Sequence, residues 1–228
     1  GQFGASGRGD GQFVWPRSID LDSEGNVYAS DDFLHRISVF DKDGAFLSSW
    51  GTNGSKEGEL NGPSGIAFDS DDNIFVVDSA NNRIQKFTKD GSFIGSFGQE
   101  GQGDGELNLP WGICVGPDGG VYVADWKNNR VQKFDSEGRF QVMFQGAETG
   151  VGDLHGPTGV AVDSEGDVYV TDWGNHRVQI YAADGHFVTT LVGDAQTPSP
   201  WTQTYIDANP DIVKARRRAN MEPEWRFR

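Results

Sequence analysis

Short runs of alternating apolar and polar residues follow one another along most of the chain. One set consists of Ile66–Phe68, Phe75–Val77, Arg83–Phe87 and Phe93–Phe97, and turns rich in Asp, Asn and Gly separate its members. Alternation with a period of two, carried by β-branched and aromatic residues, is typical of half-buried strands. The pattern therefore predicts groups of four short antiparallel strands, and no helical period competes with it.

The same group occurs four times along the chain. Its copies are 47 residues apart, and one aspartate and one arginine mark the period in each copy. The aspartates are Asp31, Asp78, Asp125 and Asp172, and the arginines are Arg36, Arg83, Arg130 and Arg177. Four antiparallel strands in a repeat of this length are the signature of a propeller blade, which packs against its neighbours. We therefore expect an all-β chain of four 47-residue, four-stranded blades.

Three segments carry a resemblance to a known family. Asp78–Gln85, Asp125–Gln132 and Asp172–Gln179 closely resemble the NHL repeat, as does the Gly-Pro-x-Gly opening of the innermost strand. The first copy departs from the pattern, with Asp31–Arg36 in the loop and Arg17-Ser18 at the opening. The resemblance covers residues 1 to about 194 and implies a β-propeller of NHL repeats, which in this family usually has six blades. A complete four-bladed ring is the alternative.

The same alignment of copies suggests three divisions of the chain. Residues 1–10 are expected to form the last strand and exit loop of a preceding blade, because Phe3-Gly4 falls where Trp50-Gly51 falls. Residues 11–194 are the four blades. Residues 195–228 break the period and are expected to be an irregular or helical insertion, or a tail leading to a further blade, with a helix starting near Asn209. A basic docking element is the alternative for this last part.

Composition limits the possible partners. The net charge is −15 at pH 7, and an acidic body repels the phosphates of nucleic acids. No run of about 18 apolar residues is present, so we expect no membrane span. One cysteine, Cys114, leaves the compartment open, with an extracytoplasmic or secreted setting slightly favoured.

The repeated aspartates and arginines bracket the loop between the second and third strands of each copy. A carboxylate there can accept loop N–H groups and pair with the arginine. Catalysis does not require four copies of one group, so we interpret these residues as structural. The Asp-rich turn at 20–26 begins like a calcium loop but lacks its closing glutamate. We therefore expect no metal and no cofactor.

Positions at which the copies differ are better candidates for function. In a propeller the loops between second and third strands share one face with the segments that enter each first strand, and we call this face the rim. Aromatic and charged residues gather there in the sequence: Trp15, Arg17, Asp32, Phe33, Trp111, Trp126 and Trp173. Such a set suits a protein or peptide, or a glycan. The alternative is that the tryptophans only pack between blades.

Two other functions have to be weighed. The family that the chain resembles includes an amidating lyase. In that enzyme, histidines that follow the proline at the start of the innermost strands hold a metal ion. The matching residues here are Arg17, Ser64, Trp111 and Thr158, none of them a histidine. Some members of the family bind RNA on a basic rim, whereas this chain is acidic. The sequence therefore predicts a non-catalytic binding or scaffold module, with a metal-dependent lyase or hydrolase and an RNA-binding protein as alternatives.

Overall fold

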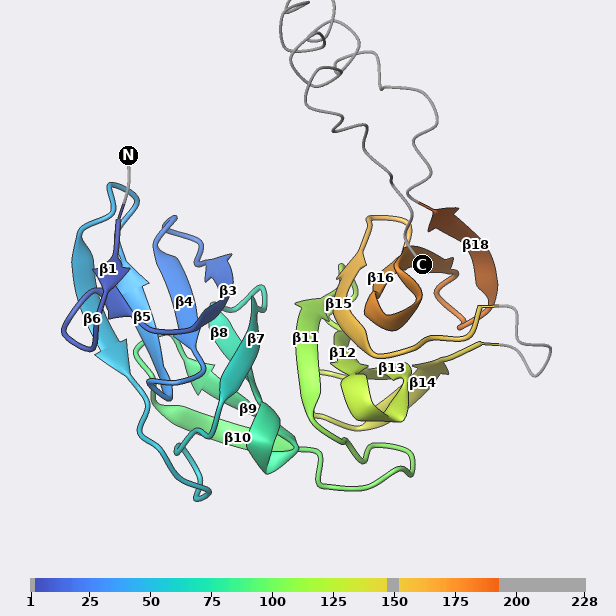
Figure 1. Ribbon diagram of the computed structural model, residues 1–228, viewed down its shortest axis with the longest axis horizontal. Coiled ribbons are helices and arrows are strands. Elements are labelled where there is room, and N and C mark those ends of the chain that lie inside the picture. Colours follow the sequence, from blue (N-terminus) through green and yellow to red (C-terminus); the bar gives the residue numbers. More distant parts are fainter. Residues whose placement is uncertain (1–2, 147–151, 193–228) are drawn as a thin grey trace, which may run out of the picture. The chain divides into compact units, whose positions relative to one another are not determined.

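The computed structural model describes residues 3–146 and 152–192, which lie in the compact unit Gly1–Leu191 apart from Val192. The chain forms four four-stranded antiparallel sheets there, and each sheet keeps its strands in chain order (Figure 1). The predicted all-β fold with four blades is confirmed. We number these sheets as blades 1 to 4 along the chain.

The strands of the blades have the following bounds. Blade 1 contains β3 (Pro16–Leu21), β4 (Val27–Asp31), β5 (Arg36–Phe40) and β6 (Phe46–Trp50). Blade 2 contains β7 (Pro63–Phe68), β8 (Asn73–Asp78), β9 (Arg83–Thr88) and β10 (Phe93–Phe97). Blade 3 contains β11 (Pro110–Val115), β12 (Val121–Asp125), β13 (Arg130–Phe134) and β14 (Phe140–Phe144). Blade 4 contains β15 (Pro157–Val162), β16 (Val168–Asp172), β17 (Arg177–Tyr181) and β18 (Phe187–Val192).

Small elements mark the connections between these strands. A parallel pair joins β1 (Ala5–Ser6) to β2 (Gln12–Phe13) ahead of blade 1, and single parallel bridges take the same place ahead of blades 2 and 3. Three loops between second and third strands form a single 3-10 turn each, where the sequence indicated only a loop: η1 (Ser79–Asn81), η2 (Trp126–Asn128) and η3 (Trp173–Asn175).

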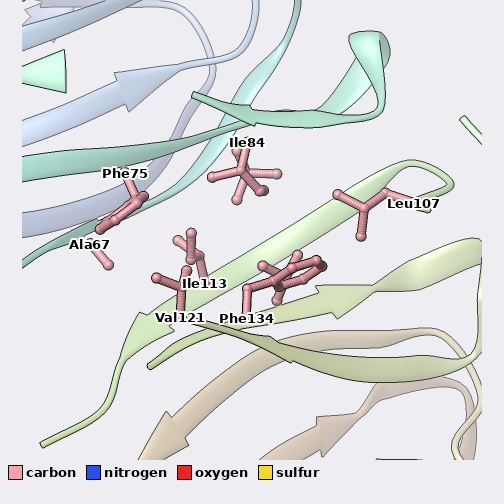
Figure 2. Packing of buried hydrophobic residues seen from close by; sticks show 9 residues of the cluster. Ala67, Phe75, Ile84, Leu107, Ile113, Val121 and Phe134 are labelled. Atoms are coloured by element: carbon pink, nitrogen blue, oxygen red, sulfur yellow. The ribbon is translucent and has the colours of Figure 1, made fainter. Parts of the chain in front are cut away.

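The hydrophobic core lies between neighbouring blades. Figure 2 shows one of its clusters, in which Ala67, Phe75 and Ile84 of blade 2 face Ile113, Val121 and Phe134 of blade 3. All of these side chains are at least nine-tenths buried. Because burial of each large apolar side chain stabilises the fold by about 1.5–3 kcal/mol, the blades depend on one another for stability.

An aromatic side chain from the last strand of blades 1, 2 and 3 packs on the following blade. Ring centroids lie 4.9 Å apart for Trp50 and Phe87, and 4.8 Å apart for Phe97 and Phe134. Phe3, 47 residues before Trp50, packs in the same way on blade 1, with its ring centroid 5.0 Å from that of Phe40.

The assignment of residues 1–10 to a preceding blade stays a prediction. The predicted linker and the helix near position 209 fall outside the described residues.

First strands of neighbouring blades approach each other closely. A Cβ atom on Gly112 of β11 would lie 2.5 Å from the backbone oxygen of Thr158 in β15. The hydroxyl of Ser64 in β7 donates to the backbone oxygen of Trp111 at 2.7 Å. Glycine after the opening position is therefore a packing requirement of adjacent first strands.

Buried carboxylates fix the loops of the rim. Asp125 is fully buried, and its Oδ1 accepts the N–H of Asn108 at 2.7 Å. Its Oδ2 accepts Arg130 Nε and Asn128 Nδ2 at 2.8 Å each, and Gln132 Nε2 at 3.3 Å. Blades 2 and 4 repeat this arrangement around Asp78 and Asp172. Since a buried charge is costly unless it is paired, the four polar partners are required together.

The arginine of each network also holds the connection from the preceding blade. Arg130 donates from Nη1 to the backbone oxygen of Gln102, and from Nη2 to those of Gly103 and Glu106, at 2.8–2.9 Å. In blade 2, Arg83 donates in the same way to the backbone oxygens of Lys56 and Glu59. One side chain thus ties a rim loop to the segment that leads into its own blade.

Blade 1 has an incomplete version of this network. Leu34 and Ser38 stand where the other copies have asparagine and glutamine. Asp31 accepts backbone N–H groups, including that of Val14 at 2.7 Å, whereas Arg36 Nε and Ser38 Oγ are buried without a hydrogen-bond partner. Arg36 Nη2 still donates to the backbone oxygens of residues 9 and 12.

Substitution of Gly112 tests the contact between first strands. We expect Gly112→Ala to lower the free energy of unfolding by about 2 kcal/mol, because the new methyl group meets the backbone of β15. Gly95→Ala is the matched control, since a Cβ there has no atom within 4 Å, and it should change stability by less than about 0.5 kcal/mol. Urea denaturation followed by tryptophan fluorescence measures both variants. Equal stabilities would contradict the described approach of β11 and β15.

A pair of arginine variants tests the buried network. Arg130→Met leaves the buried charge of Asp125 without its cation, so we expect a loss of about 3–5 kcal/mol in unfolding free energy. Arg36→Met removes a side chain whose Nε has no partner, and we expect a loss below about 2 kcal/mol. Denaturant titration under identical conditions compares them. A loss for Arg36→Met as large as that for Arg130→Met would refute the distinction between the two blades.

Candidate binding rim

The rim loops of blades 1, 2 and 3 are each tied to the blade that follows. The loops end on a residue with left-handed backbone, namely His35, Asn82, Asn129 and His176, with φ between 52° and 55°. Asn82 Oδ1 accepts the N–H of Leu109 at 2.7 Å, and Asn129 Oδ1 accepts that of Gly156 at 2.8 Å. In blade 1, His35 Nδ1 accepts the N–H of Gly62 at 3.1 Å. These bonds hold the loops against the start of the next first strand.

The variable residues of the rim form pairs within blades. In blade 1, Arg17 Nη2 lies 2.6 Å from Asp32 Oδ2 in an ion pair. In blade 3, the rings of Trp111 and Trp126 lie 5.4 Å apart at 86°. The equivalent positions of blade 2 are two serines, Ser64 and Ser79, whose hydroxyl oxygens lie 2.7 Å apart. The first strand and the rim loop of a blade therefore present one joint surface.

Blade 4 does not follow this rule. The hydroxyls of Thr158 and Thr171 are hydrogen-bonded at 3.0 Å. Trp173, which takes the place of Trp126 in the rim loop of this blade, is 63% exposed. A threonine hydroxyl has no apolar face to match an indole. Trp173 therefore remains largely in solvent.

A small pocket opens where blades 1, 2 and 3 meet on the rim. Its volume is about 120 Å³, and it is lined by Arg17, Asp32, Ser64, Ser79, Leu109, Pro110, Trp111 and Trp126. Arg17 Cζ lies 5.1 Å from the ring centroid of Trp111, which connects the ion pair of blade 1 to the tryptophans of blade 3. Arg17 and Trp111 also line an adjoining hollow of about 260 Å³ along the first strands.

A second aromatic group lies on blade 1. Trp15 and Phe33 are 58% and 40% exposed, and their rings lie 5.7 Å apart at 72°. Arg8 Cζ lies 4.9 Å from the centroid of Phe33. Of the predicted rim residues, the structure thus brings Arg17, Asp32 and the two tryptophans of blade 3 into one pocket. Trp15 and Phe33 form a separate pair, and Trp173 lies outside the pocket lining.

The tryptophans differ in how far they pack between blades. A Cβ atom on Gly156 of the following blade would lie 2.8 Å from Trp126 Nε1, so this indole packs against the start of blade 4. Trp111 and Trp126 are only partly exposed. Trp126 therefore packs partly between blades, whereas Trp15 and Trp173 face solvent.

Sequence reasoning missed several residues of the pocket, above all Leu109. Its backbone is left-handed, with φ 47°, although it is not a glycine. The same position holds Gly62 in blade 2 and Gly156 in blade 4, with φ 65° and 60°. Comparison of the copies could have found it, because Leu109 precedes Pro110 where blades 2 and 4 have glycine before the proline.

Several carboxyl groups whose pKa is lowered lie in the turns at the other end of the blades. Lys133 donates to Asp118 and holds the pKa of that carboxyl below its usual range. Hydrogen bonds from the Ser23 hydroxyl and N–H likewise lower the pKa of Asp72. Within residues 3–146 and 152–192, no group of three His, Cys, Asp or Glu side chains is placed to hold a metal ion. The same residues contain no helix long and apolar enough to span a membrane.

Comparisons with known proteins agree with this architecture. The family model for the NHL repeat matches residues 60–87, 107–134 and 154–181. Two Caenorhabditis elegans proteins are similar over single stretches. RING finger protein nhl-1 is 47% identical over 49 residues, which are 22% of this chain and 5% of that protein. Protein lin-41 is 44% identical over 46 residues, which are 20% of this chain and 4% of that protein.

Solved structures with the same fold are more distant in sequence. A catalytically inactive virginiamycin B lyase from Staphylococcus aureus with quinupristin has a TM-score of 0.62 and 18% identity, over 79% of this chain and 56% of the lyase. Kuenenia stuttgartiensis hydrazine synthase has a TM-score of 0.60 and 17% identity, over 78% and 49% of the two chains. At such identities these likenesses show the fold alone. The three matched segments show that this chain contains NHL repeats, and its four described blades share the β-propeller fold of these structures.

Proposed function

We propose that this chain is a non-catalytic binding module whose rim holds a protein or peptide partner. The observation that carries the proposal is the exposure of large aromatic rings, Trp15, Phe33 and Trp173, on the face that also bears the pocket. Scattered exposed apolar residues are normal on a protein surface, but tryptophans gathered on one face are typical of interaction sites.

The division between scaffold and rim supports the same function. The buried aspartate networks in blades 2 to 4 hold the loops without using the residues that follow each aspartate, namely Ser79, Trp126 and Trp173. These positions can therefore differ between blades without loss of the network. A rigid frame with variable loop residues is the usual design of a binding surface.

The two alternatives have less support. For the lyase alternative, the likeness to virginiamycin B lyase rests on 18% identity, and the positions that would carry metal ligands hold Arg17, Ser64, Trp111 and Thr158. For the RNA alternative, the charge of Arg17 is paired with Asp32, and the whole chain carries −15. Phosphate groups would meet an unfavourable field. A glycan remains the other ligand class for exposed aromatic rings.

Crosslinking from the rim tests the proposal directly. We expect p-benzoylphenylalanine at position 173 to form a covalent adduct with a protein in extracts of the source cells. The same residue at position 94 is the control, because Ile94 is 49% exposed on β10, away from the rim loops.

Alanine variants test the same surface once the crosslinked partner has been purified. Trp15→Ala together with Trp173→Ala should weaken binding of that partner by about 30-fold or more. The melting temperature should change by less than about 3 °C, because both side chains are exposed.

Three results would overturn the proposal. Equal crosslinking from positions 173 and 94 would show no preference for the rim. Parallel loss of melting temperature and binding would assign the tryptophans to packing. Turnover of a glycine-extended peptide by the intact protein with added zinc, abolished by a chelator, would replace the binding module with the lyase.

A further inference from the structure

The pocket at the junction of blades 1, 2 and 3 contains a strained residue. Left-handed backbone is disfavoured for leucine, and blades 2 and 4 have glycine at the position of Leu109. The side chain of Leu109 is not part of the core. Leu107, two residues earlier, fills the cluster in Figure 2 and is fully buried, whereas Leu109 is only partly buried and lines the pocket. The strain is thus associated with a pocket wall and not with core packing.

The indole rings of the pocket are already occupied by cations of this chain. Arg17 Cζ lies 5.1 Å from the Trp111 centroid, and Lys127 Nζ lies 4.5 Å from the Trp126 centroid. A ligand with a positive charge would approach two cations and would have to compete with them for the rings. The pocket therefore disfavours a cationic group.

Several polar atoms of the pocket are engaged inside the protein. Asp32 Oδ2 accepts both Nε and Nη2 of Arg17, at 2.9 Å and 2.6 Å. The hydroxyls of Ser64 and Ser79 donate to the backbone oxygens of Trp111 and Pro110, at 2.7 Å and 2.6 Å. A sugar needs several free donors and acceptors for its hydroxyls, and a buried peptide N–H needs an acceptor. A proline residue has no N–H and presents only C–H groups to the walls.

We propose that this pocket holds a proline ring from an extended, proline-rich segment of the partner protein, and that Leu109 is a specificity-determining wall of it. The inference rests on the proposed function, because it specifies what the rim recognises. A volume of about 120 Å³ suits one small ring, and the perpendicular indoles of Trp111 and Trp126 form a corner for it. Polyproline II segments dock in aromatic grooves at a low entropic cost because they are already extended.

Titration with defined peptides tests this inference on the whole chain labelled with ¹⁵N-tryptophan. The probe is an acetylated decaproline peptide, and an alternating Gly-Ser peptide of equal length, decalysine and maltohexaose are the comparison ligands. Trp111→Phe and Trp126→Phe assign the two indole N–H signals. We expect decaproline to shift both signals saturably, and the comparison ligands to leave them in place.

Leu109 variants show whether the wall matters for binding or for folding. Leu109→Gly should weaken decaproline binding by about tenfold, with an unchanged or higher melting temperature, because glycine fits left-handed backbone. Leu109→Asn is the second variant, since Asn82 and Asn129 adopt this conformation here. Leu47→Ala is the matched control, because Leu47 is 52% exposed on the outermost strand of blade 1, and it should bind normally.

Several outcomes would overturn the inference. Unmoved indole signals with decaproline, or shifts with decalysine or maltohexaose instead, would reject a proline ring as the occupant. A fall in melting temperature with full retention of binding in Leu109→Gly would make Leu109 structural. These failures leave crosslinking from position 173 unaffected, so they are distinguishable from failure of the binding-module proposal.

Discussion

A buried carboxylate at the end of the second strand is the constraint on which the rest of the structure depends. Asp78, Asp125 and Asp172 are fully buried, and a charge in that position is tolerated only with several donors around it. An arginine, an asparagine, a glutamine and a backbone N–H from the segment before the blade supply them. Because these donors come from the loop, from the third strand and from the interblade connection, one acceptor fixes all three.

This arrangement separates stability from recognition. The network uses the aspartate and the residues three, five and seven positions after it, and leaves the next residue of the loop free to differ between blades. The structure contains an ion pair, a hydroxyl pair, an indole pair and an unmatched tryptophan at these sites. Blade 1, whose network is incomplete, also bears the exposed Trp15 and Phe33. Its rim differs most from those of the other blades.

The sequence was sufficient for the fold because the information there is local and repeated. Strand alternation, the aspartates and arginines, and the rim as the variable face could all be predicted from the 47-residue period. The pairing of Arg17 with Asp32 could not, since it depends on how side chains are directed from a strand and from the loop that follows its neighbouring strand. The left-handed backbone of Leu109 is not evident from the leucine itself, and only the glycines at the same position in blades 2 and 4 point to it. The residue pattern indicated only a loop at the position of η2. The 3-10 turn that forms there ends on Asn129, whose backbone is left-handed.

Amide hydrogen exchange tests the central role of the buried carboxylates most directly. The N–H groups of Asn61, Asn108 and His155 lie in loops, but each donates to a fully buried aspartate at 2.6–2.7 Å. We expect these three amides to exchange as slowly as those of the central strands, and more slowly than the Val14 amide at the incomplete network of blade 1. Exchange of all three at the rate of ordinary loop amides would contradict it.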